Sequence, residues 1–390
     1  MTIRKIAPEE HMEILKIRSV SYNSSKDFSD PEKVKKGYET IRALFDDSGK
    51  PCATTCLEPY VVNYNGNAVK MGGIGAVATL PQERNRGYVR DIFRYCFEEM
   101  RENEQWFSYL FPFSHPYYRM YGYECCNVRR SVNIPLNAFS ELKYPGRAVL
   151  FEFDKHLDIV KEIYAKFIAD KNLAVIRNDA WWENIFKKDP YTQLCSTYIW
   201  YNEHEEPVAY IAYDASNEAQ NEINATEIAF TDYNGLRGLL GFLAKFYPVF
   251  KAFKGQLPGF LDMTMIVPEP KLIQCELCPS GMNRITDVAR VLALTAPPAQ
   301  NAQVNIEVSD NFLDWNNGVF SLSFEDSTAS VKATTAAADL RCSVQSLVRF
   351  ATGYCSLKKA VDFRTAEVSD KHDLLFSLFP EKDVFMTEGF

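Results

Sequence analysis

Residues 75–91, GAVATLPQERNRGYVRD, have the composition of a site that binds an anionic group. They read as a strand, a loop with Pro81, an Arg84-x-x-Gly87 turn and the start of a helix. The first turn of a helix presents unpaired backbone N–H groups at the positive end of its dipole. A glycine there lets a diphosphate approach the backbone closely, because no Cβ stands in the way. Three arginines add charge for phosphate oxygens: Arg84, Arg86 and Arg90.

The same residues exclude two familiar phosphate loops. No Gly-Lys-Ser/Thr follows, as a Walker loop requires, and one glycine stands where a dinucleotide fingerprint needs three. Spacing alone leaves one alternative open, which is an ordinary strand–loop–helix connection with arginines on its surface.

This segment resembles the coenzyme A signature, Arg/Gln-x-x-Gly-x-Gly/Ala, of the GNAT superfamily of N-acetyltransferases. The resemblance implies that the backbone of Val77, Ala78 and Thr79 pairs with the pantetheine arm of acetyl-CoA, the expected co-substrate. It also implies a pyrophosphate site made of Arg84, Asn85, Arg86, Gly87, Tyr88, Val89 and Arg90. Val89 departs from the signature, because most of the superfamily has Gly or Ala at that place.

Within the superfamily, the chain resembles the Eis-type (enhanced intracellular survival) acetyltransferases over its whole length. Residues 118–123, Tyr-Arg-Met-Tyr-Gly-Tyr, resemble the Tyr-Gly-Arg-Phe-Gly-Tyr segment of that branch, and the chain ends on an aromatic residue, Phe390. The implied fold is α+β: tandem GNAT (acyl-CoA N-acyltransferase) domains followed by a sterol-carrier-protein-like α+β domain. The expected domains are a catalytic one over 1–143, a second over 144–281 and the sterol-carrier-like one over 282–390. A homo-oligomer, in the form of a hexamer, is implied by the resemblance only.

Acetyl transfer from a thioester needs a neutral amine, stabilisation of a developing oxyanion and a proton for the departing thiolate. A tyrosine, with an ordinary pKa of about 10, can supply that proton, since the thiolate of coenzyme A is a moderately good leaving group. Residue types alone leave four candidates: Tyr117, Tyr118, Tyr121 and Tyr123. The resemblance assigns the role to Tyr118, and it places Phe113 and Ser114 beside the acetyl end of the cofactor. The structural alternative is that all four tyrosines pack along the edge of a strand.

The carboxylate that ends the chain is the candidate base. Its ordinary pKa of about 3.3–3.7 keeps it ionised at neutral pH, so it can take a proton from an ammonium directly or through water. The resemblance implies a terminus that reaches back into the catalytic domain, which assigns this role to Phe390. A frayed tail is the alternative.

The remaining polar residues give weaker indications. No metal site is expected, because the five histidines are scattered and Cys275-x-x-Cys278 lacks a second pair. The sequence does not decide whether four acidic residues form a pocket for a polyamine or a solvated face: Asp27, Asp30, Glu58 and Glu388.

Hydrophobic periodicity and turn residues predict the elements around these sites. In the first part we expect strands at 2–6, 52–58, 60–64, 67–79 and 106–111 and a strand pair over 124–134. We also expect helices at 9–22, 31–45 and 89–100 and a short turn or helix over 115–122. In the second we expect strands at 148–153, 195–201, 207–213, 226–230 and 261–266, and helices at 155–170, 181–182 and 236–247. In the third we expect strands at 304–308 and 319–324 and a helix at 344–351.

Composition narrows the class of protein. The 390 residues carry a net charge of −8, which argues against a nucleic-acid binder, because such proteins need a basic surface. No apolar run approaches the roughly 20 residues of a membrane span, and the N-terminus lacks an apolar export signal, so a cytoplasmic location is expected. We expect a primary amine as substrate, namely an aminoglycoside, a polyamine or a lysine side chain, that attacks the thioester directly. The alternatives are an acyltransferase that uses a longer acyl chain and a non-catalytic lipid or acyl-CoA binding protein.

Overall fold

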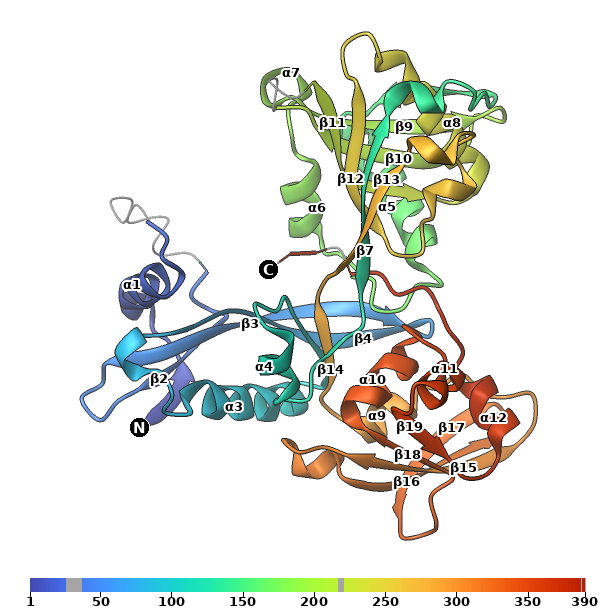
Figure 1. Cartoon of the computed structure of the whole chain (residues 1–390). Coiled ribbons are helices and arrows are strands. Elements are labelled where there is room, and N and C mark those ends of the chain that lie inside the picture. The colour runs from blue at the N-terminus through green and yellow to red at the C-terminus, as the bar shows by residue number, and fades with distance from the viewer. Residues whose placement is uncertain (26–36, 217–220, 387, 390) are drawn as a thin grey trace. The chain divides into compact units, whose positions relative to one another are not determined.

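The computed structural model describes residues 1–25, 37–216, 221–386 and 388–389 (Figure 1). They form two compact units. Unit 1 contains the described residues of 1–126, 281–382 and 388–390, and unit 2 contains those of 127–280 and 383–387.

The N-terminal part of unit 1 is a seven-stranded sheet in the order β1-β2-β3-β4-β5-β14-β6. Its strands are β1 (Thr2–Lys5), β2 (Ile41–Phe45), β3 (Pro51–Tyr64), β4 (Asn67–Thr79), β5 (Gln105–Leu110), β6 (Glu124–Cys125) and β14 (Met282–Ile285). Neighbouring strands are antiparallel except β4 and β5. A parallel pair needs a crossover connection, which α3 (Tyr88–Glu102) provides.

Helices α1 (His11–Tyr22) and α3 cover opposite faces of this sheet (Figure 1). Side chains of β2 alternate between the two faces. Ala43 and Phe45 belong to the core on the α1 side, and their neighbour Leu44 belongs to the core on the α3 side. Helix α3 buries an apolar stripe of Ile92, Phe93, Cys96, Phe97 and Met100, which the periodicity predicted.

The C-terminal part of unit 1 is a five-stranded sheet in the order β17-β16-β15-β18-β19 with four helices. These elements are β15 (Ala302–Ser309), β16 (Gly318–Glu325), β17 (Thr328–Thr334), β18 (Leu340–Ser343), β19 (Ala366–Val368), α9 (Val288–Leu292), α10 (Val344–Thr352), α11 (Leu357–Asp362) and α12 (His372–Leu378). A buried ion pair ties this part to the N-terminal sheet: Arg284 Nη2 of β14 lies 2.6 Å from Asp310 Oδ2, just after β15.

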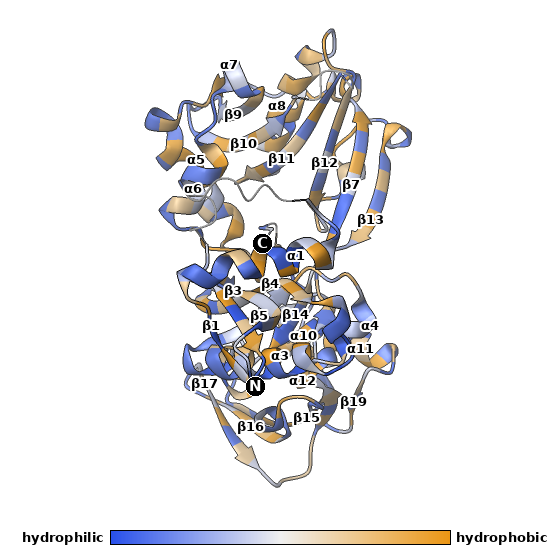
Figure 2. Cartoon of the chain, turned by 90° about the vertical axis from the view of Figure 1, so that its left-hand side faces the viewer, coloured by the Kyte–Doolittle hydropathy of each residue, from blue (hydrophilic) through white to orange (hydrophobic). Residues whose placement is uncertain are grey.

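Unit 2 is a second seven-stranded sheet, in the order β13-β7-β12-β11-β10-β9-β8. Its elements are β7 (Val128–Pro135), β8 (Gly146–Leu150), β9 (Cys195–Asn202), β10 (Pro207–Asp214), β11 (Glu222–Phe230), β12 (Ala252–Pro258), β13 (Gln274–Pro279), α5 (Phe153–Ile168), α6 (Asp179–Phe186), α7 (Pro190–Gln193) and α8 (Tyr233–Leu243). Strands β7, β12 and β13 alternate hydrophilic and hydrophobic residues along their length (Figure 2). That alternation is typical of a sheet with one solvated face.

Two of the expected elements are wrong. The helix expected over 31–45 ends in a strand instead, because 41–45 form β2, whose five residues are all buried. Residues 31–36 lie outside the described part. The strand expected over 261–266 is a 3-10 turn at Met263–Met265, and the strand of this region is β12, which the sequence reading missed. Lys254 and Gly255 in its middle weaken the β pattern, and its place between β7 and β11 comes from tertiary pairing.

Two strands pair with a sheet on the other side of an expected domain boundary. β7 begins at Val128, ahead of the expected boundary at 143, and pairs with β12 and β13 of unit 2. β14 begins at Met282 and lies between β5 and β6 in the N-terminal sheet.

Candidate active site

β4 stays paired with β3 along its whole length but separates from β5 halfway. Its register with β3 runs from Tyr64↔Asn67 to Ala53↔Thr79, whereas its register with β5 ends at Ile74↔Leu110. On the β5 side, residues 75–79 have no strand partner in the described sheet. The backbone there can pair with an extended ligand that carries amide groups, as it would pair with a strand.

A β-bulge lies in this opening. Between the pairs Cys56↔Gly75 and Thr54↔Ala78, β4 has two residues where β3 has one. Ala76, one of the two, has a φ of +49°, which is unfavourable by about 1–2 kcal/mol for a residue with a Cβ. Bulges redirect the backbone and often lie next to active sites. The bulge therefore changes where the peptide groups at the opening point.

The last turn of α1 borders the opening. Tyr22 donates its hydroxyl hydrogen to the Val77 carbonyl (2.7 Å), and Ser21 Oγ donates to the Thr79 carbonyl (3.1 Å). Leu80 N donates to Cys52 O, so the backbone N–H of Leu80 points toward β3. Because the backbone groups of successive strand residues point to opposite sides, those of the alternate residues point away from β3. The N–H groups of Val77 and Thr79 therefore face the opening together with their carbonyls.

Helix α3 starts beside this opening with an uncovered N-terminus. Gly87 is its N-cap residue, has a φ of +82° and makes no side-chain capping bond. Arg86 of the loop pairs with Glu83 (3.0 Å) and also bonds to Tyr88, and Arg90 in the first turn of α3 forms an exposed pair with Asp91 (3.0 Å). An exposed pair contributes about 0–1 kcal/mol, so the Arg90 guanidinium can turn to a phosphate at little cost.

A cavity of about 710 Å³ connects the opening to the α3 N-terminus. Eleven predicted cofactor residues line it: Val77, Ala78, Thr79, Arg84, Asn85, Arg86, Gly87, Tyr88, Val89, Arg90 and Phe113. Ser114, the twelfth, is instead the N-cap of α4 (His115–Arg119) and accepts from Tyr117 N (3.5 Å). The sequence reading did not assign Ser21, Tyr22 or Glu83 to the cavity, which they also line. No local signal indicates which turn of α1 lies against β4.

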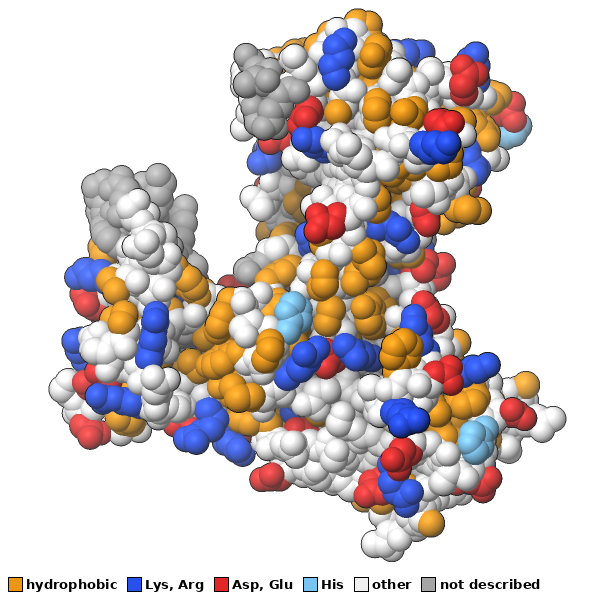
Figure 3. Space-filling model, in the orientation of Figure 1, with side chains coloured by type: hydrophobic (Ala, Val, Ile, Leu, Met, Phe, Trp, Pro, Cys, Tyr) orange, Lys and Arg blue, Asp and Glu red, His pale blue; other side chains and the backbone are white. Residues whose placement is uncertain are grey.

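The four candidate tyrosines differ in what their hydroxyl groups do. Tyr123 is fully buried and bonded to Ser108 Oγ (2.6 Å), and Tyr121 donates to Tyr117 (3.3 Å). Tyr118 is the one whose hydroxyl makes no hydrogen bond to a described residue. Hydrophobic side chains gather on the surface over α4 (Figure 3).

The surroundings of Tyr118 keep its phenol protonated. Its side chain is 4% exposed and its ring stacks on Phe93, with 6.2 Å between centroids. Burial raises the pKa of Tyr118 above its ordinary value, and the phenols of Tyr22 and Tyr117 raise it further. Because Tyr22 bonds to Val77, the Tyr118 phenol lies near the opening of β4.

The described end of the chain lies against β3. Phe390 is outside the described residues, but Glu388 is buried and belongs to unit 1. Burial, and then the carboxylates of Glu58 and Glu388, raise the pKa of Tyr60. Glu58 also accepts from Thr40 Oγ1 (2.5 Å). Of the four acidic residues named in the sequence, these two are near one phenol, and Asp27 and Asp30 lie outside the described residues.

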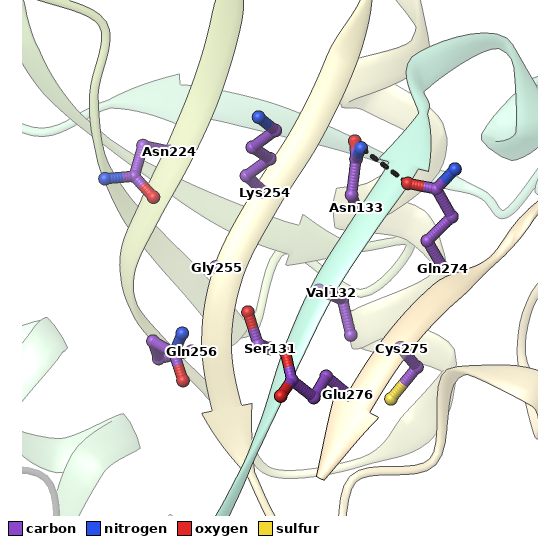
Figure 4. Close-up of a pocket in the computed structure, with 10 residues that line it drawn as sticks. All are labelled: Ser131, Val132, Asn133, Asn224, Lys254, Gly255, Gln256, Gln274, Cys275 and Glu276. Carbon is purple, nitrogen blue, oxygen red and sulfur yellow. Dashed lines mark hydrogen bonds between the residues drawn. The ribbon is translucent and has the colours of Figure 1, made fainter. Parts of the chain in front are cut away.

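A second cavity, of about 510 Å³, lies on the solvated face of unit 2, over β7, β11, β12 and β13 (Figure 4). It is lined mainly by amide and hydroxyl side chains, and Asn133 Nδ2 donates to Gln274 Oε1 (2.9 Å). Helix α8 of this unit is capped by Asp232, whose carboxylate accepts from Gly235 N (2.8 Å). A carboxylate at that terminus repels a diphosphate, so α8 is a weaker candidate for an anion site than α3.

Three domain families match the chain. Residues 2–126 match an acetyltransferase (GNAT) domain, 173–291 match another acetyltransferase (GNAT) domain, and 288–387 match a sterol carrier protein domain. This confirms the fold class expected from the sequence, with tandem GNAT domains followed by a sterol-carrier-like domain. No curated protein matches the chain significantly in sequence.

Several solved structures share this fold over the whole chain. A conserved protein of unknown function from Enterococcus faecalis V583, described as a probable N-acyltransferase, is 20% identical with a TM-score of 0.86, covering 98% of both chains. A GCN5-related N-acetyltransferase from Anabaena variabilis is 19% identical with a TM-score of 0.86, and Eis1 from Mycobacterium abscessus is 17% identical with a TM-score of 0.81. Both of these cover 100% of this chain and of their own. At these identities the likeness is one of fold.

Two features are absent from the described residues. No group of His, Cys, Asp or Glu side chains among them is suited to hold a metal ion. No helix among them is both long and apolar enough to cross a membrane.

Proposed function

Since this chain belongs to the GNAT superfamily of N-acetyltransferases, with the domain order of the Eis-type branch, we propose that it transfers the acetyl group of acetyl-CoA to a primary amine. One observation carries the proposal: a single cavity joins the open edge of β4 to the N-terminus of α3. Tyr118 does not itself line that cavity, but its phenol interacts with those of Tyr22 and Tyr117, which do. An aminoglycoside, a polyamine or a lysine side chain is the expected class of substrate.

In this proposal, the residues of the cavity bind and orient acetyl-CoA. The N–H groups that follow Gly87, together with the arginines of the loop, hold the diphosphate. The peptide groups of Val77 and Thr79 pair with the amides of the pantetheine arm. Backbone N–H groups at the bulge polarise the thioester carbonyl, because they are fixed and aimed before the reaction begins.

Two proton transfers complete the reaction, with no covalent enzyme intermediate. The amine attacks the thioester carbonyl, forms the new C–N bond and expels the thiolate. Tyr118 gives its proton to that thiolate, and the Phe390 carboxylate takes the proton that the amine loses, directly or through water. Glu58 and Glu388, near Tyr60, provide negative charge where a cationic substrate can bind.

Removal of Phe390 tests the proposed base. We expect turnover to fall by about 10²–10⁴-fold, the usual contribution of an acid or base, because the carboxylate moves to Gly389 and out of position. The Kd for acetyl-CoA should stay within about twofold, since the cavity is untouched. Phe390→Ala is the matched control, because it keeps the carboxylate at the same place in the chain. Unchanged turnover after the deletion would rule out this base.

The dependence of the rate on pH tests whether the Tyr118 phenol stays protonated. The rate should rise with pH as the amine substrate loses its proton. Because the pKa of Tyr118 is raised above its ordinary value of about 10, the acid stays protonated and no falling limb is expected below about pH 10. Release of coenzyme A thiol, followed from pH 6 to 10, measures this. A falling limb centred below pH 9 would contradict the assignment.

A panel of amines and acyl donors separates the alternatives. Thiol release with acetyl-CoA and a cationic amine supports the proposal. Faster release with a longer acyl donor identifies an acyltransferase of another donor class, and binding without release identifies a non-catalytic acyl-CoA binder. The hexamer and the cytoplasmic location implied by the resemblance stay predictions, and light scattering measures the first.

A further inference from the structure

We infer that helix α10 of the C-terminal part holds the helix that carries Tyr118, so that Arg349 and Gln345 are positioning residues for the acid. This inference rests on the proposed function and deepens it. It gives the sterol-carrier-like part a role in the chemistry that does not require it to bind a lipid.

Helix α4 cannot hold its own geometry. It has five residues, and helices much shorter than about 12 residues are marginal in water without tertiary contacts. Its N-cap bond, from Tyr117 N to Ser114 Oγ, is long at 3.5 Å. Its last turn closes through the carbonyl of Tyr118, which accepts from Tyr121 N (3.0 Å) and Tyr123 N (3.3 Å). The orientation of the phenol therefore depends on what supports this turn from outside.

α10 supplies that support through three contacts. Gln345 Nε2 donates to the carbonyl of Arg119, the residue after Tyr118 (3.1 Å). Arg349 Nη2 lies 3.0 Å from Glu124 Oε1, and Arg349 Nε donates to the Cys125 carbonyl (3.4 Å). Basic and acidic side chains form a short row on the surface between α4 and α10 (Figure 3).

Glu124 links the two helices because it binds both arginines. Arg119 of α4 contacts it through Nε (2.9 Å) and Nη2 (2.8 Å), a two-point geometry that fixes direction as well as distance. Burial by itself would raise the pKa of Glu124, but Arg119, the Cys125 amide and Arg349 outweigh burial and hold the pKa below its ordinary value. Glu124 therefore stays ionised, and both guanidinium groups are held to it.

A second support lies under the same turn, on β14 of the N-terminal sheet. Gly122 has a φ of +82°, and a Cβ there would lie 2.1 Å from Arg284 Nη1. Arg284 is itself fixed by Asp310 in the C-terminal part. The turn that ends α4 therefore packs on an arginine whose position the C-terminal part sets.

Arg349→Met tests the inference. It keeps a long apolar stem and leaves Glu124 paired with Arg119. A misplacement of about 1 Å can cost about 10²-fold in rate, so we expect kcat to fall by about 10–100-fold. KM for acetyl-CoA should stay within about twofold, because α10 does not line the cavity. Arg341→Met is the control, because Arg341 forms an ion pair with Glu307 (2.8 Å) in the same part of the chain but away from α4, and this variant's kcat should not change.

A double-mutant cycle distinguishes positioning from a general structural role. In the Tyr118→Phe background, Arg349→Met should lower the rate by less than about twofold, since the phenol it positions is gone. A similar loss in both backgrounds, or no loss in either, overturns the inference. If Arg349→Met fails to fold, Gln345→Met replaces it in the same cycle. The Gln345 contact is exposed, so its loss should not prevent folding.

The same cycle separates this inference from the proposed function. A large loss in Tyr118→Phe with no loss in the α10 variants overturns the inference and leaves the acid in place. No loss in Tyr118→Phe itself removes the acid, and the role of α10 with it.

Discussion

Tyr118→Phe is expected to lower kcat by about 10²–10⁴-fold, with the Kd for acetyl-CoA unchanged within about twofold. The substitution removes one hydroxyl group and keeps the ring that stacks on Phe93. That hydroxyl makes no hydrogen bond to a described residue, so its loss leaves no buried partner unsatisfied and stability should change little. Steady-state kinetics by thiol release, together with calorimetric binding of acetyl-CoA, measures both quantities.

The neighbouring tyrosines provide matched controls. Tyr117→Phe removes a cavity-lining phenol that only accepts from Tyr121, and Tyr123→Phe removes one bonded to Ser108. Neither should lower kcat by more than about tenfold, because the proposal gives the proton transfer to Tyr118. Tyr117 is the sharper control, since it accepts from Tyr121 and keeps its own hydroxyl hydrogen at the cavity. A loss in Tyr117→Phe equal to that in Tyr118→Phe would show that the acid has been assigned to the wrong residue.

Gly87→Glu should abolish binding of acetyl-CoA. The φ of +82° opposes any Cβ by about 1–2 kcal/mol, and the new carboxylate would stand at the helix N-terminus where the diphosphate must lie. The Cβ itself would meet only the mobile end of Arg90, at 3.0 Å, so charge rather than collision is the main cause.

Two control variants separate strain from charge at this position. Gly87→Ala introduces the strain alone, and Gly87→Gln adds the size of the side chain without its charge. Calorimetric titration should give a Kd that rises modestly in Ala, further in Gln and beyond measurement in Glu. Equal affinity in the Gln and Glu variants would contradict a diphosphate at this turn.

Local sequence signals predicted the part of the site that lies within one stretch of chain. The strand, the Arg84-x-x-Gly87 turn and the apolar stripe of α3 are all set by residues within about 25 positions, and the structure has each of them. The turn between β3 and β4 is local in the same way, because Asn65-Gly66 is a typical dipeptide of a two-residue hairpin loop.

Features that depend on distant partners could not be predicted. Tyr22 and Val77 are 55 residues apart, and their bond depends on how α1 packs across the sheet. Gln345 and Arg119 are 226 residues apart, and no pattern in either segment indicates the other. β12 could not be predicted either, because its pairing with β7 and β11, and not its own composition, makes it a strand. The strand, turn and helix of the proposed cofactor site could therefore be predicted from the sequence, and the distant contacts that support them could not.

A crystal structure of the complex with acetyl-CoA tests the central claim most directly. The account predicts the diphosphate on the N–H groups that follow Gly87, the pantetheine arm along residues 75–79, and the thioester sulfur within about 3–3.5 Å of the Tyr118 hydroxyl or one water away. A diphosphate bound elsewhere, or a sulfur beyond the reach of that hydroxyl, would contradict it.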